Sequence, residues 1–281
     1  MKKMTSLLLA LLMTIGMVFS SFASYMAYEP TEVAYAAAKT YFKTAENKNI
    51  VSLDKVLEIA ETGDALILDI RSAEDYAKGH IEGAVNIPFL EVVNYLDQFP
   101  YHKQIIVMCY SGQTAGQIVG SLHLAGFDAY SMSGGMGSVT EFTPLETTIN
   151  PFVPAEPIKL NPREAALHEA ARAAMTIPAD KDVIQPAVLA ENLDKYFIVD
   201  IRDKDVFDKG HIEGAVNIPY YEVGDNLHKL PKDQTIAVVC NTGQTASQTV
   251  AVLKAAGFKA YNVQGGMNNG WNKQGLPTHT H

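Results

Sequence analysis

The chain contains two cysteines, and each comes directly after a short apolar run and before a loop that contains a glycine. Cys109 opens the loop CYSGQTA, and Cys240, 131 residues further on, opens CNTGQTA. Two copies of a domain share many core residues, but a lone thiol kept at the start of both loops indicates a site. A thiol reacts as its thiolate, which a helix N-terminus or a cation stabilises. The cysteines are therefore the first candidates for covalent chemistry.

Each loop leads into a stretch that is expected to be helical, residues 115–125 in the first copy. If the loop curls around the sulfur, its backbone N–H groups form an anion-binding nest that the helix dipole reinforces. Gly112 and Gly243 permit the tight curl, and the Ser and Thr hydroxyls are further donors. The candidate substrate-binding residues are those of the two loops: Tyr110, Ser111, Gly112, Gln113, Thr114 and Ala115, and Asn241, Thr242, Gly243, Gln244, Thr245 and Ala246. The alternative is a pair of inert core cysteines, which two matched loops disfavour.

The cysteine loops belong to a repeat that covers most of the chain. Residues 69–88 read DIRSAEDYAKGHIEGAVNIP, and residues 200–219 read DIRDKDVFDKGHIEGAVNIP, at the same offset of 131. The offset still holds at the Gly-Gly-Met segments 134–136 and 265–267. A chain of 281 residues suits two domains. We expect domains at 45–140 and 181–276, separated by a Pro-rich and helical linker at 141–180.

Within each copy, apolar strands alternate with helical segments. Residues 65–70 and 105–108 are typical of buried strands, a short helix is expected at 73–78, and Gly134 is expected to begin a terminal helix. Helix 115–125 should bury one face that carries Ile118, Val119, Leu122 and Leu124. This alternation predicts α/β domains, each with a small parallel sheet flanked by helices on both faces. Ligands bind such sheets at the carboxyl ends of strands, where both cysteines lie.

The linker contains a clear helix start. Asn161 is a suitable N-cap, Pro162 follows in the first turn, and Glu164 stands at the third position. The helix is expected to run to Met175, and a comparable alanine-rich segment, 34–42, precedes the first copy. These helices are either packing arms of the repeating unit or spacers, and the sequence leaves both alternatives open.

Composition excludes several classes of function. The net charge of −9 and the pI near 5.3 argue against a nucleic-acid or anionic-membrane partner. No two Cys or His residues have metal-ligand spacing except His279 and His281 at the tail, so neither a metal nor a cofactor is expected.

The N-terminus predicts export. Residues 1–23 combine Lys2 and Lys3, an apolar run at 7–19 and the small-x-small end Ser21-Phe22-Ala23, as in a signal peptide. The alternative is an uncleaved anchor, but the run is shorter than the ~20 residues of a membrane span. An exported protein can form disulfides. A bridge between Cys109 and Cys240 would require their Cα atoms within ~7 Å, so free thiols are favoured.

The motif DIR…KGHIEGAVNIP, followed by an apolar strand, a cysteine, a six-residue loop and Gly-Gly-Met, resembles the rhodanese family in tandem. The resemblance covers residues 51–136 and 183–275. It implies small α/β domains in which a cysteine persulfide carries sulfur from a donor such as thiosulfate to a thiol or cyanide. It makes Cys109 and Cys240 the nucleophiles. The implied partners are a small sulfur-containing substrate and a thiol acceptor.

The resemblance also assigns supporting residues. Asp69 with Arg71, and Asp200 with Arg202, match an acid–base pair that holds loops in place. The histidines of the two Gly-His-Ile segments, His80 and His211, match a structural histidine, although their residue type would also suit a general acid or base. Two further positions differ between the copies: Asp75, where the family often has Glu, corresponds to Val206, and Thr140 corresponds to Trp271.

The loops lack the arginine that many rhodaneses carry. A dianionic donor would therefore be held by dipoles alone, which leaves room for polysulfide or protein persulfide donors. We expect an exported sulfurtransferase, and the alternative is a persulfide carrier without multiple turnover, which the missing cation favours. A phosphatase of this fold would need an arginine where Ala115 and Ala246 stand, so that function is rejected.

Overall fold

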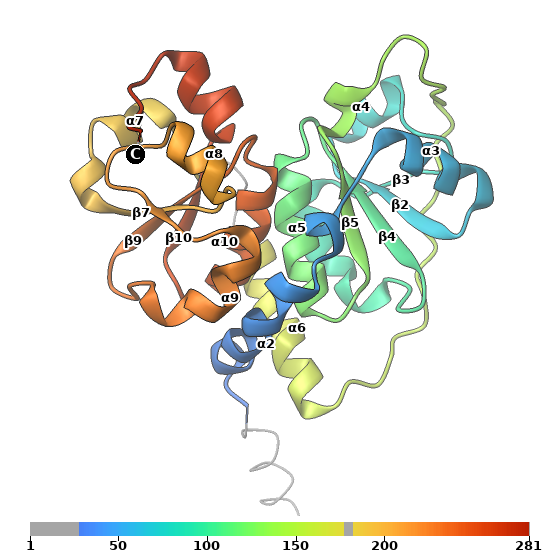
Figure 1. Cartoon of the computed structure of the whole chain (residues 1–281). Helices are drawn as coiled ribbons and strands as arrows, with labels where there is room; N and C mark the ends of the chain where they lie inside the picture. Colours follow the sequence, from blue (N-terminus) through green and yellow to red (C-terminus); the bar gives the residue numbers. More distant parts are fainter. Residues whose placement is uncertain (1–27, 177–181, 281) are drawn as a thin grey trace, which may run out of the picture.

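The structure is a computed structural model that describes residues 28–176 and 182–280. Two α/β domains lie side by side, and helices α2 and α6 lie at one end of the interface between them (Figure 1). The predicted signal peptide, residues 1–23, lies outside the described residues. Within the described ranges, no helix combines the length and the apolar character needed to cross a membrane.

Domain 1 contains a five-stranded parallel sheet in the order β1-β5-β4-β2-β3. Its strands are β1 (Ile50–Val51), β2 (Ala65–Asp69), β3 (Val85–Asn86), β4 (Gln104–Met108) and β5 (Ala129–Met132). Its helices are α3 (Leu53–Thr62), α4 (Ala73–Lys78) and α5 (Gln113–Leu124). Three 3-10 segments complete it: η1 (Glu46–Asn49), η2 (Phe89–Gln98) and η3 (Gly135–Ser138).

Domain 2 repeats this sheet in the order β6-β10-β9-β7-β8, again parallel throughout. Its strands are β6 (Val183–Ile184), β7 (Tyr196–Asp200), β8 (Val216–Asn217), β9 (Thr235–Val239) and β10 (Ala260–Val263). Its helices are α7 (Pro186–Ala190), α8 (Lys204–Lys209), α9 (Val223–Asn226) and α10 (Gln244–Ala255). The shorter turns are η5 (Leu193–Lys195), η6 (Tyr220–Glu222), η7 (Leu227–Lys229), the π-helix η8 (Gly266–Trp271) and η9 (Asn272–Gln274).

The central strands bury both of their faces, which is why they are apolar throughout. On β4, Ile105 and Val107 join the core beneath α5, whereas Ile106 and Met108 join the core beneath α3. Successive side chains of a strand point to opposite faces. Cys109 follows on the α5 side, and Cys240 has the same place after β9. The predicted fold class is confirmed: two small parallel sheets, each with helices on both faces.

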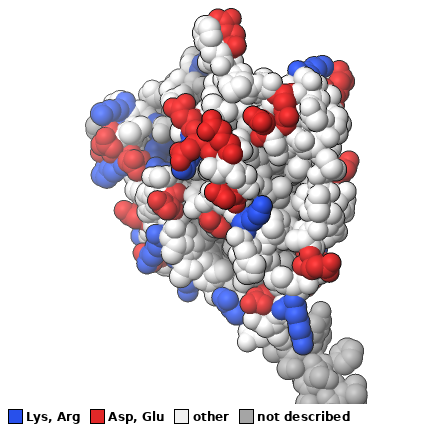
Figure 2. Space-filling model, turned by 90° about the vertical axis from the view of Figure 1, so that its right-hand side faces the viewer, with Lys and Arg blue, Asp and Glu red and all other residues white. Residues whose placement is uncertain are grey.

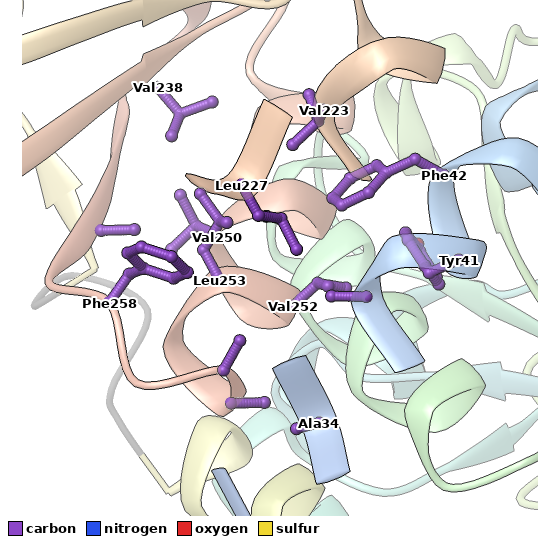
Figure 3. Close-up of a cluster of buried hydrophobic side chains, with 14 of the residues drawn as sticks. Ala34, Tyr41, Phe42, Val223, Leu227, Val238, Val250, Val252, Leu253 and Phe258 are labelled. Atoms are coloured by element: carbon purple, nitrogen blue, oxygen red, sulfur yellow. The ribbon is translucent and has the colours of Figure 1, made fainter. Parts of the chain in front are cut away.

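Helices α2 (Pro30–Thr44) and α6 (Pro162–Met175) are packing arms, so the spacer alternative is wrong. Helix α6 begins and ends where the sequence predicted, and Asn161 and Glu164 form the expected capping box. Each arm, however, also contributes side chains to the core of the repeat that it does not precede. Phe42 of α2 lies in the core of domain 2, where it points toward Val223 (Figure 3).

The second arm makes the converse contact with domain 1. Ala171 and Met175 of α6 join the domain 1 core, and Arg172 bonds to Asp97 and to the Val93 carbonyl, both on η2. Its other side chains, such as Ala170, face α2 and domain 2. The arms are exchanged in this sense: each reaches into the core of the other repeat, while α6 also packs against its own. Full burial of a side chain such as Phe42 contributes about 1.5–3 kcal/mol relative to exposure.

The two cysteine-loop helices form the centre of the interface. A Cβ atom on Gly116 would lie 2.4 Å from the Gln244 carbonyl oxygen, and one on Gly120 would lie 2.7 Å from that of Gln248. From the first contact to the second, the position moves four residues toward the C-terminus in both helices. Helices α5 and α10 therefore run parallel, with their N-termini together. The predicted buried face is confirmed, since Ile118, Val119, Leu122 and Leu124 are all buried, but it is not the whole buried surface of the helix. The helix starts at Gln113 and also buries its glycine face, because a second domain covers it.

The predicted terminal helix after Gly134 is much shorter in domain 1 than in domain 2. Domain 1 has the single turn η3, whereas domain 2 has the π-helix η8. Trp271 accounts for the difference, because its buried ring packs in the domain 2 core and its Nε1 donates to the Pro277 carbonyl at 2.9 Å. Thr140 at the equivalent position has no such ring.

Candidate active site

The Cys109 sulfur lies at the centre of a curled loop. Strand β4 ends at Met108, and the loop turns at Gly112, whose φ of +83° makes it a left-handed N-cap for α5. The backbone N–H groups of Gly112 and Ala115 donate to Sγ at 3.1 and 3.4 Å. The cysteine is only 2% exposed. Two of the six backbone N–H groups expected in the nest thus point at the sulfur.

The Cys240 loop has the same geometry. Gly243, with φ of +89°, caps α10, and the N–H groups of Gly243 and Ala246 donate to Sγ at 3.1 and 3.4 Å. The side chain is 4% exposed. Both cysteines are free thiols, as predicted. Two dipolar N–H groups on one sulfur favour a negative charge there, whether on a thiolate or on a sulfur attached to it.

The Gly-Gly-Met segment forms the back wall of each loop, a role that the sequence reasoning missed. In domain 1, the Met136 N–H donates to the Cys109 carbonyl and the Gly137 N–H donates to the Tyr110 carbonyl, both at 2.8 Å. A Cβ atom on Gly135 would lie 2.4 Å from the Cys109 carbonyl oxygen, so only glycine fits. The repeated Gly-Gly-Met was the available signal. Because the wall engages the loop carbonyls, the loop N–H groups remain for the sulfur.

The same wall stands behind the second loop. Met267 donates to the Cys240 carbonyl at 2.8 Å, and Asn268 donates to the Asn241 carbonyl at 2.7 Å.

The Ser and Thr hydroxyls of the two loops were expected to be further donors to the sulfur, but the structure places them elsewhere. Among the described residues, none of them donates to a sulfur atom, and their side chains are exposed or half-buried: Ser111, Thr114, Thr242 and Thr245.

The acid–base pairs are buried. Arg71 donates to both carboxylate oxygens of Asp69, at 2.6–3.0 Å, and its Nη2 donates to the Gly79 carbonyl at 2.8 Å. Arg202 makes the same bonds to Asp200 and to the Gly210 carbonyl. Each pair joins the end of a strand to the turn after the following helix, and none of these bonds involves sulfur.

In the described part of the chain, each histidine bonds to the helix that precedes it. His80 is buried, stacks on Tyr76 at 3.6 Å between ring centroids, and has its Nδ1 2.8 Å from the Tyr76 carbonyl oxygen. His211 stacks on Phe207 at 3.9 Å, and its Nδ1 lies 3.0 Å from the Phe207 carbonyl oxygen. These contacts fit a structural role better than acid or base catalysis.

The two sites differ at their mouths. In domain 1, the Tyr110 hydroxyl donates to Asp75 Oδ2 at 2.6 Å, and Lys78 bonds to the other oxygen at 2.9 Å. A shallow pocket of about 280 Å³ lies beside this arrangement, lined in part by Arg71 and Met136. Domain 2 has Asn241 and Val206 at the positions of Tyr110 and Asp75, so it cannot form this bond.

Neither loop contains Lys or Arg, although Arg71 and Lys78 line the pocket beside the first loop. On the face of domain 1 that is turned away from domain 2, Asp and Glu gather while Lys and Arg are scattered (Figure 2). Within the described part of the chain, no cluster of three His, Cys, Asp or Glu residues could hold a metal ion.

Comparison with known proteins assigns the family. The model for the rhodanese-like domain matches residues 52–141 and 185–274, more than half of the chain. The chain therefore belongs to the rhodanese-like family and carries two such domains in tandem. Relatives of this family that match the chain, described next, include proteins named sulfurtransferases.

The chain is 38% identical over 105 residues to the probable adenylyltransferase/sulfurtransferase MoeZ of Mycobacterium tuberculosis, a match that covers 35% of this chain and 26% of that protein. The chain thus spans only about a quarter of that relative. It is 31% identical over 86 residues to the thiosulfate sulfurtransferase GlpE of Pseudoalteromonas translucida, covering 30% of this chain and 82% of that protein. The structure of the 3-mercaptopyruvate sulfotransferase SseA of Escherichia coli matches with TM-score 0.39 and 20% identity, over 78% of this chain and 98% of that one.

Proposed function

We propose that the protein is an exported sulfurtransferase that carries sulfane sulfur as a persulfide on Cys109 and Cys240. The observation that carries this proposal is the pair of backbone N–H groups, at 3.1 and 3.4 Å, on each buried sulfur. These donors lie at the N-terminus of a twelve-residue helix, where an anion is stabilised. The product of the first step, a persulfide, is an anion near physiological pH.

The reaction balances in two steps. In the first, the cysteine thiolate attacks the sulfane sulfur of the donor, an S–S bond forms, and the donor's own S–S bond breaks. Thiosulfate leaves as sulfite, and a polysulfide leaves one sulfur shorter. In the second step, an acceptor thiolate or cyanide attacks the outer sulfur, which restores the cysteine thiolate and releases a persulfide or thiocyanate. The covalent intermediate divides one transfer into two easier ones.

Polysulfide is the donor that the loop chemistry favours over thiosulfate. Thiosulfate carries two negative charges on a compact group, and the loops offer it no side-chain cation for a charge-assisted bond. A polysulfide spreads its charge over a longer chain and places less of it at the loop. A thiol is the proposed acceptor. Export rests on residues 1–23, whose pattern is that of a signal peptide.

The test is intact-mass measurement of the purified protein after incubation with polysulfide or thiosulfate. We expect a gain of one sulfur atom on each cysteine, and the variants Cys109→Ser and Cys240→Ser should each lose one of the two. Absence of added sulfur on both cysteines would contradict the proposal. Mass measurement of the secreted or cell-envelope form tests export, since cleavage after Ala23 removes residues 1–23.

The alternative function is a persulfide carrier, which the missing loop cation favours. Adding a thiol acceptor together with excess donor distinguishes the two. An enzyme releases many persulfide products per cysteine. A carrier releases at most one, and after the excess donor has reloaded it, its persulfide is not passed to the thiol.

A further inference from the structure

The side chains of Gln113 and Gln244 leave their own cysteine loops and bind the opposite domain. Gln244 follows Gly243 in the domain 2 loop, yet its Nε2 donates to Ser131 Oγ at 2.8 Å and to the Met132 carbonyl at 3.1 Å. Its Oε1 accepts from the Gly134 N–H at 3.3 Å. It is buried, so these bonds have little competition from water.

Gln113 makes the reciprocal contact. Its Oε1 accepts from the Gly265 N–H of domain 2 at 3.2 Å. Each glutamine also covers the opposite loop's glycine: a Cβ atom on Gly112 would lie 2.6 Å from Gln244, and one on Gly243 would lie 2.7 Å from Gln113 Oε1. The parallel, glycine-mediated packing of α5 and α10 brings the two loops close enough for this exchange.

The residues that the glutamines bind are the walls of the cysteine loops. Gly134 immediately precedes Gly135, which packs against the Cys109 carbonyl, and Gly265 precedes Gly266, which packs against the Cys240 carbonyl. Both glycine pairs have positive φ, between 56° and 70°, in a backbone that has more conformational freedom than any other, so a hydrogen bond helps to hold it in one conformation. A bond to the first glycine of a pair therefore fixes the wall that presents the loop N–H groups to the sulfur.

We propose that Gln113 and Gln244 are positioning residues that act across the domain interface, each shaping the persulfide site of the other domain. This inference rests on the proposed function, because it concerns the loading of the same two cysteines. It makes the two sites mutually dependent: Gln244 supports Cys109, and Gln113 supports Cys240. If instead each glutamine served its own loop, the dependence would run within a domain.

The test compares the full-length wild type with Gln113→Met and Gln244→Met. Methionine has a similar length and covers the same glycine, but it lacks the amide group that makes the bonds. Each protein is given limiting polysulfide, and the initial loading rate of each cysteine is measured separately by peptide mass analysis. The ratio of the two rates within one molecule is the readout, because a general loss of folded protein lowers both rates together.

We expect a crossed pattern. Gln113→Met should slow loading of Cys240 relative to Cys109, and Gln244→Met should slow Cys109 relative to Cys240, each by about two- to ten-fold for the loss of one positioning bond. An unchanged ratio, or slowing confined to the glutamine's own loop, overturns the inference. Should Gln244→Met fail to fold, the less buried Gln113 decides alone. A wild type that loads neither cysteine contradicts the proposed function instead.

Discussion

The Tyr110 hydroxyl donates a hydrogen bond to Asp75 Oδ2 at 2.6 Å, which ties the residue beside Cys109 to helix α4. This hydrogen bond, followed by that from Lys78, holds the pKa of the Asp75 carboxyl well below its usual range. The carboxylate therefore stays ionised as the acceptor, and the half-exposed tyrosine ring is fastened at the mouth of the first site. Domain 2 has no counterpart of this bond, so the two cysteines have different approaches.

Tyr110→Phe should open the mouth of the first site. Without its hydroxyl, the ring loses its attachment to Asp75, and a bulky thiol reagent should alkylate Cys109 about two- to five-fold faster, as suits one exposed, screened interaction. Cys240 in the same molecule is the control, and its rate should not change. An unchanged rate at Cys109 would mean that the ring position does not depend on this bond.

Arg71→Leu should destabilise the protein strongly. The substitution leaves the Asp69 carboxylate buried without its partner, which costs about 3–5 kcal/mol. Guanidinium denaturation measures the loss. Lys78→Ala removes an exposed lysine from ion pairs with Glu74 and Asp75 and should leave the midpoint almost unchanged. Equal effects of the two substitutions would contradict the structural role of the buried pair.

Gly116→Ala should be destabilising even though alanine is the better helix former. The added methyl group would lie 2.4 Å from the Gln244 carbonyl oxygen, so α5 and α10 must separate, at a cost of about 1–3 kcal/mol. Thermal unfolding measures this. Gly210→Ala is the matched control, because its Cβ would meet only Thr278 at an ordinary 3.7 Å. A rise in Tm for Gly116→Ala would show that the helices tolerate a wider separation.

Phe42→Ala should weaken the repeat that lies farther along the chain. Phe42 is fully buried and packs edge-on against Tyr220 of domain 2, at 5.3 Å between ring centroids. Its truncation should cost about 3–5 kcal/mol. Hydrogen exchange should show the loss of protection first in β9 and α10. Phe142→Ala, at a position that is 86% exposed, should have no effect. Greater loss in domain 1 would contradict the exchange of arms.

Lowering the pH should destabilise the protein, because the buried His123 must take up a proton. Burial lowers the pKa of this histidine, whose Nε2 lies 2.6 Å from the Ala129 carbonyl oxygen. The unfolded chain then binds the proton more readily than the folded one, so stability is complete above about pH 6.5 and declines below it. His123→Gln should reduce the drop in Tm between pH 7.5 and pH 5, roughly the window of this linkage. The exposed His102→Gln should leave that drop as it is; an identical drop in both variants would exclude His123 as its source.

The sequence predicted most of what is local in this fold. Apolar runs located the central strands, and the Asn161 cap located α6, because both depend on neighbouring residues. The repeat placed Cys109 and Cys240 in equivalent loops, and the curl around each sulfur followed from the strand, glycine and helix order.

Contacts between the repeats could not be predicted in this way. The glycine stripe of α5 was visible in the sequence, but nothing local indicated that α10 would cover it. The same holds for the direction in which Gln113 and Gln244 point, because these glutamines have ordinary loop positions in sequence. The arms illustrate the limit most clearly. Both were recognised as helices, but the domain 2 residues that α2 packs against lie more than a hundred residues further along the chain.

The exchanged arms give the chain the construction of a swapped dimer whose two subunits have been joined by residues 142–160. A repeat cut free would expose the surface that the arm from the other half covers, and its own arm would lose part of its contacts. Joining the halves turns a pairing that depends on concentration into an intramolecular one. It also allows the two halves to differ in sequence. A homodimer must carry the same residue at both mouths, whereas this chain has Tyr110 at one and Asn241 at the other.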